Sequence, residues 1–235
     1  MALVVIEGLD GAGSSTQVDL LIKYLQAIGK KVDFVHFPNY EEKYTGELIS
    51  KYLRGEFQNI NQNIIYYLYA MNRYLCLTDL EKKLENNDYV ILDRYVLSSM
   101  AYQGINIKNI TEQDFQNNKL IKEKVNYIYK LMSDLEFQVF GLPLPTCEIY
   151  LQVPFYHIQK VNTYRINNDN RKYLKGKNDI HETNFQYLKL VDKMYNYIFD
   201  NFSNGRYKVK CFNDNDNMLE PKEIHKMILD ILLKG

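Results

Sequence analysis

A glycine-rich run constrains the fold of this chain more than any other part of its sequence. Gly8 to Thr16 follows the apolar, β-prone stretch Leu3 to Ile6 and leads into a stretch with helical apolar spacing, from about Val18 to Ile28. A strand, a glycine-rich turn and a helix in this order are the setting of a P-loop, whose pattern is G-x-x-x-x-G-K-[ST]. Backbone N–H groups and the helix N-terminus of such a loop bind nucleotide phosphates. The sequence therefore predicts a loop that binds the phosphates of a nucleoside triphosphate, made of Gly8, Leu9, Asp10, Gly11, Ala12, Gly13, Ser14, Ser15 and Thr16.

One position departs from the P-loop pattern. Gly8 and Gly13 occupy the two glycine positions and Ser15 the position of the Mg²⁺-binding hydroxyl, but Ser14 stands where the pattern has lysine. That lysine is a point charge against the β- and γ-phosphates, whereas a serine hydroxyl offers one hydrogen bond and no charge. We expect phosphoryl transfer to weaken unless another cation reaches the phosphates. An ordinary strand-to-helix turn, with Ser14 or Ser15 near the N-cap, is the alternative.

Strand patterns alternate with helix patterns along the rest of the chain. Four further strands are predicted at Val32 to Phe37, Tyr89 to Leu92, Cys147 to Val153 and Tyr207 to Phe212. Helix periodicity lies at about Thr45 to Leu53, Asn61 to Leu84, Lys119 to Phe140, His181 to Phe202 and Pro221 to Leu233. Such alternation implies right-handed crossovers and a mostly parallel sheet. We predict one α/β domain over residues 1–235, with a P-loop NTPase fold and a five-stranded sheet flanked by helices on both faces.

Composition excludes several classes of protein. Lys and Arg number 29, as do Asp and Glu, so the chain lacks the basic surplus that non-specific nucleic-acid binding needs. No apolar run approaches the roughly 20 residues of a membrane span, and no basic leader precedes the first strand. The three cysteines, Cys76, Cys147 and Cys211, are widely spaced among apolar neighbours and are expected to be reduced. We therefore expect a soluble, cytoplasmic protein with no nucleic-acid or membrane partner.

Asp93 to Gln103 follows the third predicted strand and begins with an aspartate and an arginine. Both residue types at the carboxyl end of a parallel strand suit an acceptor-phosphate site. With this run the chain resembles thymidylate kinases, the P-loop enzymes that phosphorylate dTMP, over essentially its full length. The motifs that carry the resemblance are Glu7-Gly8 with Asp10-Gly11, Phe37-Pro38-Asn39-Tyr40, Tyr69 with Arg73, and Asp93 to Tyr102. The chain further resembles a bacterial subgroup of the family at Asp134 to Phe137, Phe140 to Pro143 and Asp179 to Glu182.

The resemblance implies a binding site for dTMP. In the family the residue matching Arg73 contacts the thymine O4 side, the one matching Arg94 clamps the acceptor phosphate, and the one matching Tyr69 stacks on the thymine. Tyr102 would crowd the 2′ position of the sugar and favour deoxyribose. The full set implied for dTMP is Asp10, Phe37, Tyr40, Tyr69, Arg73, Arg94, Ser99, Tyr102 and Gln103.

A polar segment, Asn162 to Asn178, first suggests only a solvated loop. In thymidylate kinases that lack a P-loop arginine, however, a mobile lid in this region supplies arginines to the phosphates. Position 11 is Gly here, so the resemblance implies a lid over about residues 162–178. It assigns catalysis to Arg94, Asp10, Arg165 and Arg171, and Mg²⁺ binding to Ser15, Asp10 and Glu182. His181 is expected to pack in the lid or at a helix start rather than act as a base.

The resemblance implies ATP-dependent, Mg²⁺-dependent phosphorylation of dTMP to dTDP by a homodimer, and the composition predicts that the protein is cytoplasmic. Two alternatives stay open. Ser14 allows a nucleotide-binding homologue that has lost most turnover. Glu41 and Glu42, just after the second strand, allow a deoxynucleoside kinase, although Arg73 and Arg94 anticipate an acceptor that already carries a phosphate.

Overall fold

A parallel sheet forms the centre of the molecule. The computed structural model describes residues 1–57, 60–168, 171–202 and 204–234. Its five strands pair in the order β2-β3-β1-β4-β5, and all four pairings are parallel. The strands are β1 (Ala2–Glu7), β2 (Val32–His36), β3 (Tyr89–Asp93), β4 (Cys147–Gln152) and β5 (Arg206–Lys210). The predicted five-stranded sheet is confirmed.

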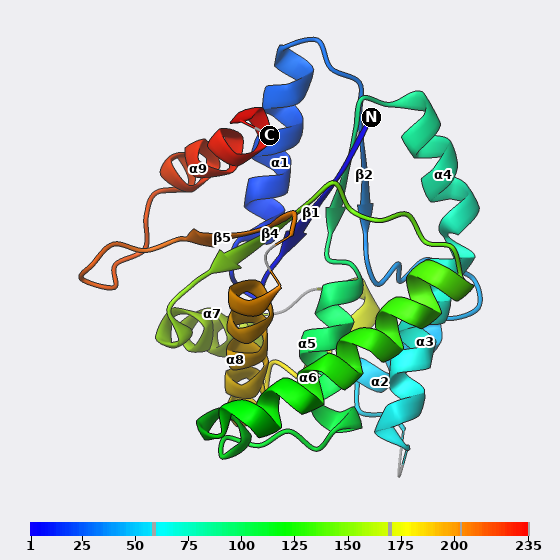
Figure 1. Ribbon diagram of the computed structural model, residues 1–235, viewed down its shortest axis with the longest axis vertical. Coiled ribbons are helices and arrows are strands. Elements are labelled where there is room, and N and C mark those ends of the chain that lie inside the picture. The colour runs from blue at the N-terminus through cyan, green and yellow to red at the C-terminus, as the bar shows by residue number, and fades with distance from the viewer. Residues whose placement is uncertain (58–59, 169–170, 203, 235) are drawn as a thin grey trace.

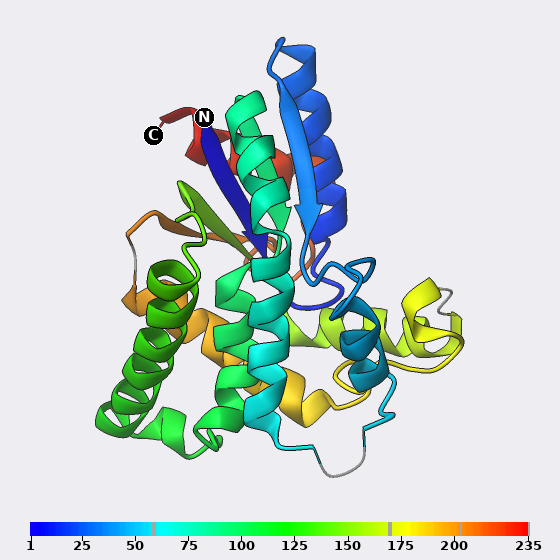
Figure 2. The ribbon, with the colours of Figure 1, turned by 90° about the vertical axis from the view of Figure 1, so that its right-hand side faces the viewer.

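Helices cover the sheet on different sides (Figures 1 and 2). Helix α1 packs against α9, whereas α5 packs against α3, α6 and α8. The helices are α1 (Ser14–Ala27), α2 (Gly46–Leu53), α3 (Gln62–Leu75), α4 (Leu77–Asn86), α5 (Val96–Ile107), α6 (Asn118–Ser133), α7 (Phe155–Asn168), α8 (Phe185–Asn201) and α9 (Pro221–Lys234). Three short helical turns are η1 (Asp114–Gln116), η2 (Asp134–Val139) and η3 (Lys172–Leu174). Among the described residues, no helix is long and apolar enough to cross a membrane.

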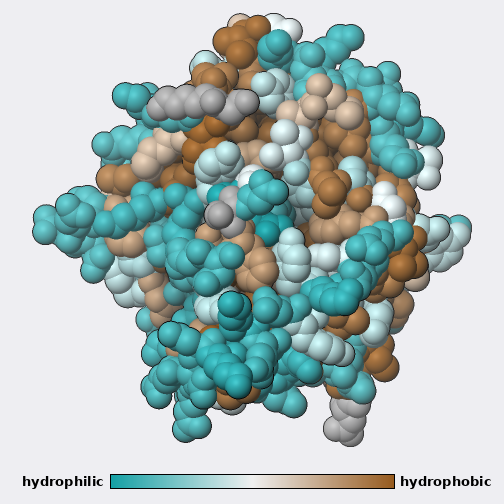
Figure 3. All heavy atoms as spheres, in the orientation of Figure 1, coloured by the Kyte–Doolittle hydropathy of each residue, from teal (hydrophilic) through white to brown (hydrophobic). Residues whose placement is uncertain are grey.

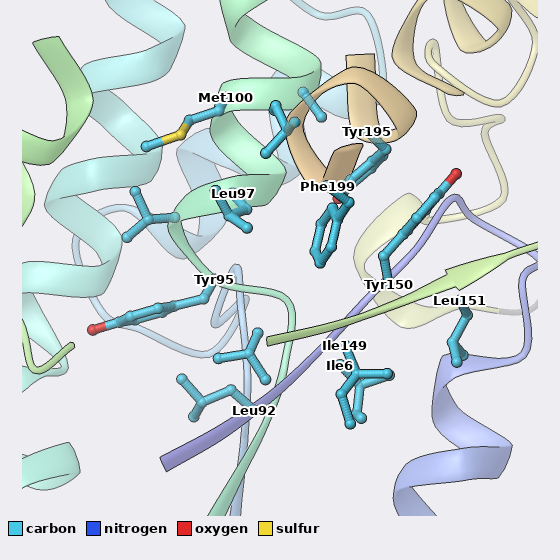
Figure 4. Packing of buried hydrophobic residues seen from close by; sticks show 14 of the residues in the cluster. Ile6, Leu92, Tyr95, Leu97, Met100, Ile149, Tyr150, Leu151, Tyr195 and Phe199 are labelled. Atoms are coloured by element: carbon cyan, nitrogen blue, oxygen red, sulfur yellow. The ribbon is translucent and has the colours of Figure 1, made fainter. Parts of the chain in front are cut away.

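The core lies where the central strands meet α5 and α8 (Figure 4). Ile6, Leu92 and Ile149, from β1, β3 and β4, are fully buried. Tyr150 of β4 stacks on Tyr195 of α8 with ring centroids 4.9 Å apart. Strands covered on both faces carry apolar residues continuously rather than alternately, which explains why the sequence showed them as apolar runs. On the outside, hydrophilic residues cover the α6 and α8 end of the molecule (Figure 3).

Some helices differ from the sequence prediction. Helix α5 was not predicted, because nine of its residues are buried and it shows no polar face to reveal the helical period. The single helix predicted over Asn61 to Leu84 is two helices, α3 and α4, which meet at Cys76. The helix predicted over Lys119 to Phe140 is α6 followed by the π-helical turn η2. The turn η2 carries a buried carboxylate, that of Glu136.

The predicted lid is only partly a loop. Its first residues belong to the end of α7, which the sequence analysis missed because its apolar residues are sparse. Residues 169–170 of the predicted lid lie outside the described residues. Beyond them η3 and an irregular stretch lead to α8, which begins at Phe185 rather than at His181.

Candidate active site

One cavity of about 280 Å³ lies at the carboxyl ends of β1, β2 and β3. Its walls come from the P-loop, the turn after β2, α3, the start of α5 and the lid. Parallel sheets bind ligands at this edge, because the loops that follow neighbouring strands converge there. The predicted site residues that line the cavity are Asp10, Gly11, Gly13, Ser14, Ser15, Thr16, Phe37, Tyr40, Tyr69, Arg73, Arg94, Ser99, Tyr102, Gln103, Arg165 and Arg171.

Four predicted site residues do not line the cavity. Leu9 and Ala12 of the P-loop are buried in the core, and Gly8 packs beneath Ala12. The side chains of Leu9 and Ala12 therefore support the loop rather than face a ligand. Glu182 is also buried, and its carboxylate pairs with the two lid arginines instead of facing the cavity.

The P-loop turns into α1 through two glycines in the left-handed region. Gly13, at the N-cap, has φ 88° and Gly11 has φ 95°, a region that other residues rarely adopt. A Cβ at Gly11 would also lie 3.0 Å from Cγ1 of Val161 on α7. Helix α7 thus occupies the space that a P-loop arginine would need. The first turn of α1, with Ser14 to Thr16, faces the cavity.

Arg94 and Asp10 form the charged centre of the cavity. Arg94 Nη2 lies 3.0 Å from Asp10 Oδ1, and the Tyr102 hydroxyl donates to Asp10 Oδ2 at 3.2 Å. Burial opposes ionisation of Asp10, but the guanidiniums of Arg94, Arg171 and Arg165 lower its pKa. The two lid arginines therefore lie close enough to the P-loop to act on its aspartate electrostatically.

A buried carboxylate holds Arg94 in position. Arg94 has φ 69°, a sparsely populated conformation for a non-glycine residue. Glu7, at the end of β1, accepts hydrogen bonds from the Tyr95 N–H, the Ser98 hydroxyl and the Tyr195 hydroxyl. Two of these bonds secure Tyr95 and Ser98, which directly follow Arg94 at the start of α5. Glu7 belongs to the sequence motif Glu7-Gly8, which by itself indicates no role for its carboxylate.

The lid arginines share one partner. Arg165 Nη1 lies 3.3 Å from Glu182 Oε1, and Arg171 Nη2 pairs with Glu182 Oε2. Burial raises the pKa of Glu182, while the arginines act in the opposite direction. In this arrangement both oxygens of Glu182 face guanidinium groups, so Glu182 anchors the lid cations.

Asp10 and Ser15 fit a magnesium ion that arrives with a nucleotide. Both line the cavity and both offer oxygen atoms. No group of three or more His, Cys, Asp or Glu residues in the described part of the chain could hold a metal ion. Mg²⁺ is commonly bound by one or two side chains, with phosphates and water completing its shell. The donor set is therefore suited to a phosphate-bound ion rather than to a protein cage.

The opposite end of the cavity is aromatic and contains Arg73. The Arg73 guanidinium binds Glu136 of η2 through two hydrogen bonds and Ser99 Oγ through a third, at 2.8 Å. Tyr69, one turn earlier on α3, packs with Tyr52 of α2 in a small second cluster of buried residues and also lines the cavity. An aromatic face beside a fixed guanidinium can bind a planar, polar ring.

The turn after β2 is held by a residue that the sequence analysis missed. The Asn72 side chain accepts from the Asn39 N–H at 2.8 Å and donates to the Asn39 carbonyl and to Thr45 Oγ1, both at 2.9 Å. Asn72 is fully buried on α3. These bonds place Tyr40, which stacks on Tyr173 of η3 with ring centroids 3.9 Å apart. The only signal in the sequence was the position of Asn72 beside Arg73.

Two further cavity residues come from the motif Asp179 to Glu182. His181 lies among Tyr52, Tyr102 and Tyr187, and burial lowers its pKa to about 4. Burial, with Asp10 and Glu182 nearby, raises the pKa of Asp179 to about 8. Both line the cavity, so His181 belongs to the site wall as well as to the packing that the sequence predicted.

Comparisons with known proteins agree on one family. The family model for thymidylate kinase matches residues 6–210. The thymidylate kinase of Plasmodium falciparum (isolate 3D7) is 37% identical over 101 residues, which are 43% of this chain and 47% of that protein. The Homo sapiens thymidylate kinase is 32% identical over 103 residues, 44% of this chain and 48% of that protein. The chain spans about half the length of these curated relatives.

Solved structures confirm the fold class. Thymidylate kinase from Candida albicans has a TM-score of 0.71 at 20% identity, over 99% of this chain and 91% of that chain. Thymidylate kinase from Ehrlichia chaffeensis has a TM-score of 0.62 at 16% identity, over 98% of both chains. The predicted α/β P-loop NTPase fold is therefore confirmed.

Proposed function

This chain belongs to the thymidylate kinase family, and we propose that it phosphorylates dTMP to dTDP with ATP as the phosphate donor. One observation carries the proposal. A single cavity joins the P-loop to Arg94 at its centre and to Tyr69 and Arg73 at its far end. Phosphoryl transfer depends chiefly on positioning two substrates and neutralising their charge, and this arrangement supplies both.

The acceptor occupies the half of the cavity away from the P-loop. Tyr69 stacks on the thymine while Arg73, with Ser99 and Gln103 beside it, meets the edge of the base. Arg94 binds the acceptor phosphate through its guanidinium fork, which suits phosphate oxygens. Tyr102 lies beside Asp10 and disfavours a 2′-hydroxyl. Tyr40 and Phe37 complete the wall near the acceptor phosphate.

The donor phosphates lie on the P-loop and the N-terminus of α1. Asp10 and Ser15 would hold the Mg²⁺ ion, which when bound neutralises phosphate charge. Ser14 supplies a hydroxyl but no charge at the position of the usual lysine. Arg165 and Arg171 line the same cavity as Ser14, which supports a role for them as the missing cations. We propose that they leave Glu182 for the phosphates when ATP binds.

We further propose that two copies of the chain form a homodimer through α3. One face of this helix exposes large apolar side chains at spacings that place them on neighbouring turns. They are Ile64, Tyr67, Met71, Tyr74 and Leu75. A soluble, cytoplasmic location remains a prediction from the sequence.

A coupled assay of ADP release tests the proposed reaction. We expect turnover with ATP and dTMP that depends on Mg²⁺, and faster turnover in Ser14→Lys, since a lysine adds a charge at the β- and γ-phosphates. Thymidine in place of dTMP is the control acceptor and should react more slowly. The proposal is wrong if neither form turns over dTMP while nucleotide binding is intact, or if thymidine is the better acceptor.

A further inference from the structure

Arg73 is held by a carboxylate to which the sequence assigned no role. Arg73 Nε lies 2.5 Å from Glu136 Oε2 and Nη2 lies 2.8 Å from Glu136 Oε1, so the pair is bidentate. The Arg73 side chain is 2% exposed and that of Glu136 is fully buried. Bidentate arginine–carboxylate pairs have a fixed geometry as well as a strong attraction. Glu136 therefore determines the direction in which the guanidinium points.

The remaining donors of Arg73 are left for a ligand. A guanidinium has five N–H donors, of which Nε carries one and each terminal nitrogen two. Nε and Nη2 bind Glu136, and Nη2 also donates to Ser99 Oγ. Within the described part of the chain Nη1 makes no hydrogen bond, and Arg73 lines the cavity. The two N–H groups of Nη1 are thus available to an acceptor atom on a bound base.

Glu136 reaches this position because α6 does not continue as a regular helix. The six residues of η2 form a π-helical turn. Such a turn has more residues than a turn of α-helix, so the side chains that follow it point in a different direction. The Leu142 N–H closes the segment by donating to the Glu136 carbonyl at 2.9 Å. Such π-helical turns recur at functional sites. The turn places a carboxylate inside the protein, where only a charged partner makes its burial tolerable.

We propose that Glu136 is a positioning residue that sets the base selectivity of the acceptor site by fixing Arg73. The inference rests on the proposed function. With Nη1 held toward the base edge, an exocyclic keto oxygen at that edge accepts its N–H groups. An exocyclic amino group at the same ring position would set donor against donor and leave buried donors unpaired, which is costly. Glu136 thus makes the site select a keto pyrimidine, as in dTMP, over an amino pyrimidine, as in dCMP.

The test compares kcat and KM for dTMP and dCMP in the wild type and in Glu136→Gln. The amide keeps the shape of the side chain but cannot accept from Arg73 through two oxygens. We expect the KM for dTMP to rise about tenfold or more with a smaller change in kcat, and the preference for dTMP over dCMP to fall at least tenfold. Glu136→Asp, which retains the charge, should recover part of the preference.

The chain offers a matched control. Glu148 of β4 is also buried and also pairs with an arginine, since Arg206 Nε lies 2.6 Å from its Oε2, but neither residue lines the cavity. Glu148→Gln therefore breaks the same kind of pair elsewhere. Glu148→Gln should lower the thermal unfolding midpoint, as Glu136→Gln does. It should leave the preference for dTMP over dCMP unchanged.

The outcomes separate the two proposals. Wild-type protein that turns over no dTMP overturns the proposed function. Wild-type turnover with an unchanged preference in Glu136→Gln, or an equal change in Glu148→Gln, overturns the role of Glu136. If Glu136→Gln does not fold, Glu136→Asp decides instead, because its shorter side chain must weaken the preference if the geometry of the pair sets it. Equilibrium binding of dTMP and dCMP gives the same comparison without catalysis.

Discussion

Burial sets the chemistry of individual residues in this cavity. His181 is buried among tyrosines, and this burial lowers its pKa to about 4. Nearby charges act on it with opposite signs, since Asp10 raises its pKa and Arg94 lowers it. A histidine that stays neutral through physiological pH can donate or accept one hydrogen bond but carries no charge to the phosphates. Its role is therefore to shape the wall between Tyr102 and Tyr187.

This shift makes a prediction about stability and pH. Because the folded-state pKa of His181 lies below its ordinary value of 6.5, the unfolded chain binds a proton that the folded chain rejects as pH falls. The contribution of His181 is complete above pH 6.5 and is lost between 6.5 and 4. From pH 7 to pH 5, His181→Phe should lose about 2 kcal/mol less of its free energy of unfolding than the wild type.

Urea unfolding at the two pH values measures this difference. Asp179, whose pKa is raised to about 8, contributes with the opposite sign over this range, so only the comparison between the two proteins isolates His181. Equal losses in the wild type and in His181→Phe would contradict the prediction.

Hydrogen bonds and ion pairs connect the lid to α2 and to the residues that follow it. Arg54, at the end of α2, donates to Glu47, to Glu56 and to the carbonyl of Tyr173 in η3. Lys175 and Lys177 pair with the same two glutamates, and the Ile180 N–H donates to the Leu53 carbonyl. Exposed ion pairs contribute little singly, but this network surrounds a buried arginine. The structure thus holds the lid against α2 while Glu182 holds its two arginines.

The arginines of the lid can be tested against a cation of α7 that lies outside the cavity. We expect Arg165→Ala and Arg171→Ala each to lower kcat about a hundredfold or more, since each removes a positive charge from phosphates that lack the P-loop lysine. Lys160→Ala is the control, because Lys160 is exposed on the same helix and does not line the cavity. Steady-state kinetics with ATP and dTMP give the comparison. Activity that persists in both arginine variants would show that other groups replace the lysine.

The whole molecule presents an apolar surface that its own fold does not cover. Tyr67, in the middle of the exposed face of α3, is 50% exposed, while the opposite face of the helix packs on α5 through residues such as Tyr66 and Ala70. Surface patches of this kind mark interaction sites in soluble proteins. A dimer through α3 would bring a second chain close to Tyr69 and Arg73, which lie on the same helix.

Sedimentation velocity tests this interface. We expect the wild type to sediment as a dimer and Tyr67→Glu to shift it toward the monomer, because a buried unpaired carboxylate is costly. Tyr164→Glu changes an even more exposed tyrosine on α7 and should leave the dimer intact. A monomeric wild type, or equal behaviour of the two variants, would count against α3 as the interface.

Much of this protein is determined by its sequence. Short-range spacing specifies the strand, turn and helix around Gly8 to Thr16, and residue order along the chain carries the family motifs. Spacing and residue order can both be read from the sequence without knowing which residues are in contact. For this reason the parallel sheet and most of the cavity residues could be predicted. The single domain over residues 1–235 and the chemical roles of the cavity residues stay predictions.

The tertiary structure alone decided what those residues face. Periodicity did not reveal α5, because it is buried nearly all round, nor the π-helical turn that carries Glu136 to Arg73 from 63 positions away in the chain. It also did not show that Glu182 binds both lid arginines, or that His181 lines the cavity. Partners and burial depend on which distant segments the fold brings together, and these two properties set direction and charge. Sequence therefore determined which groups are present, and the fold determined which of them meet.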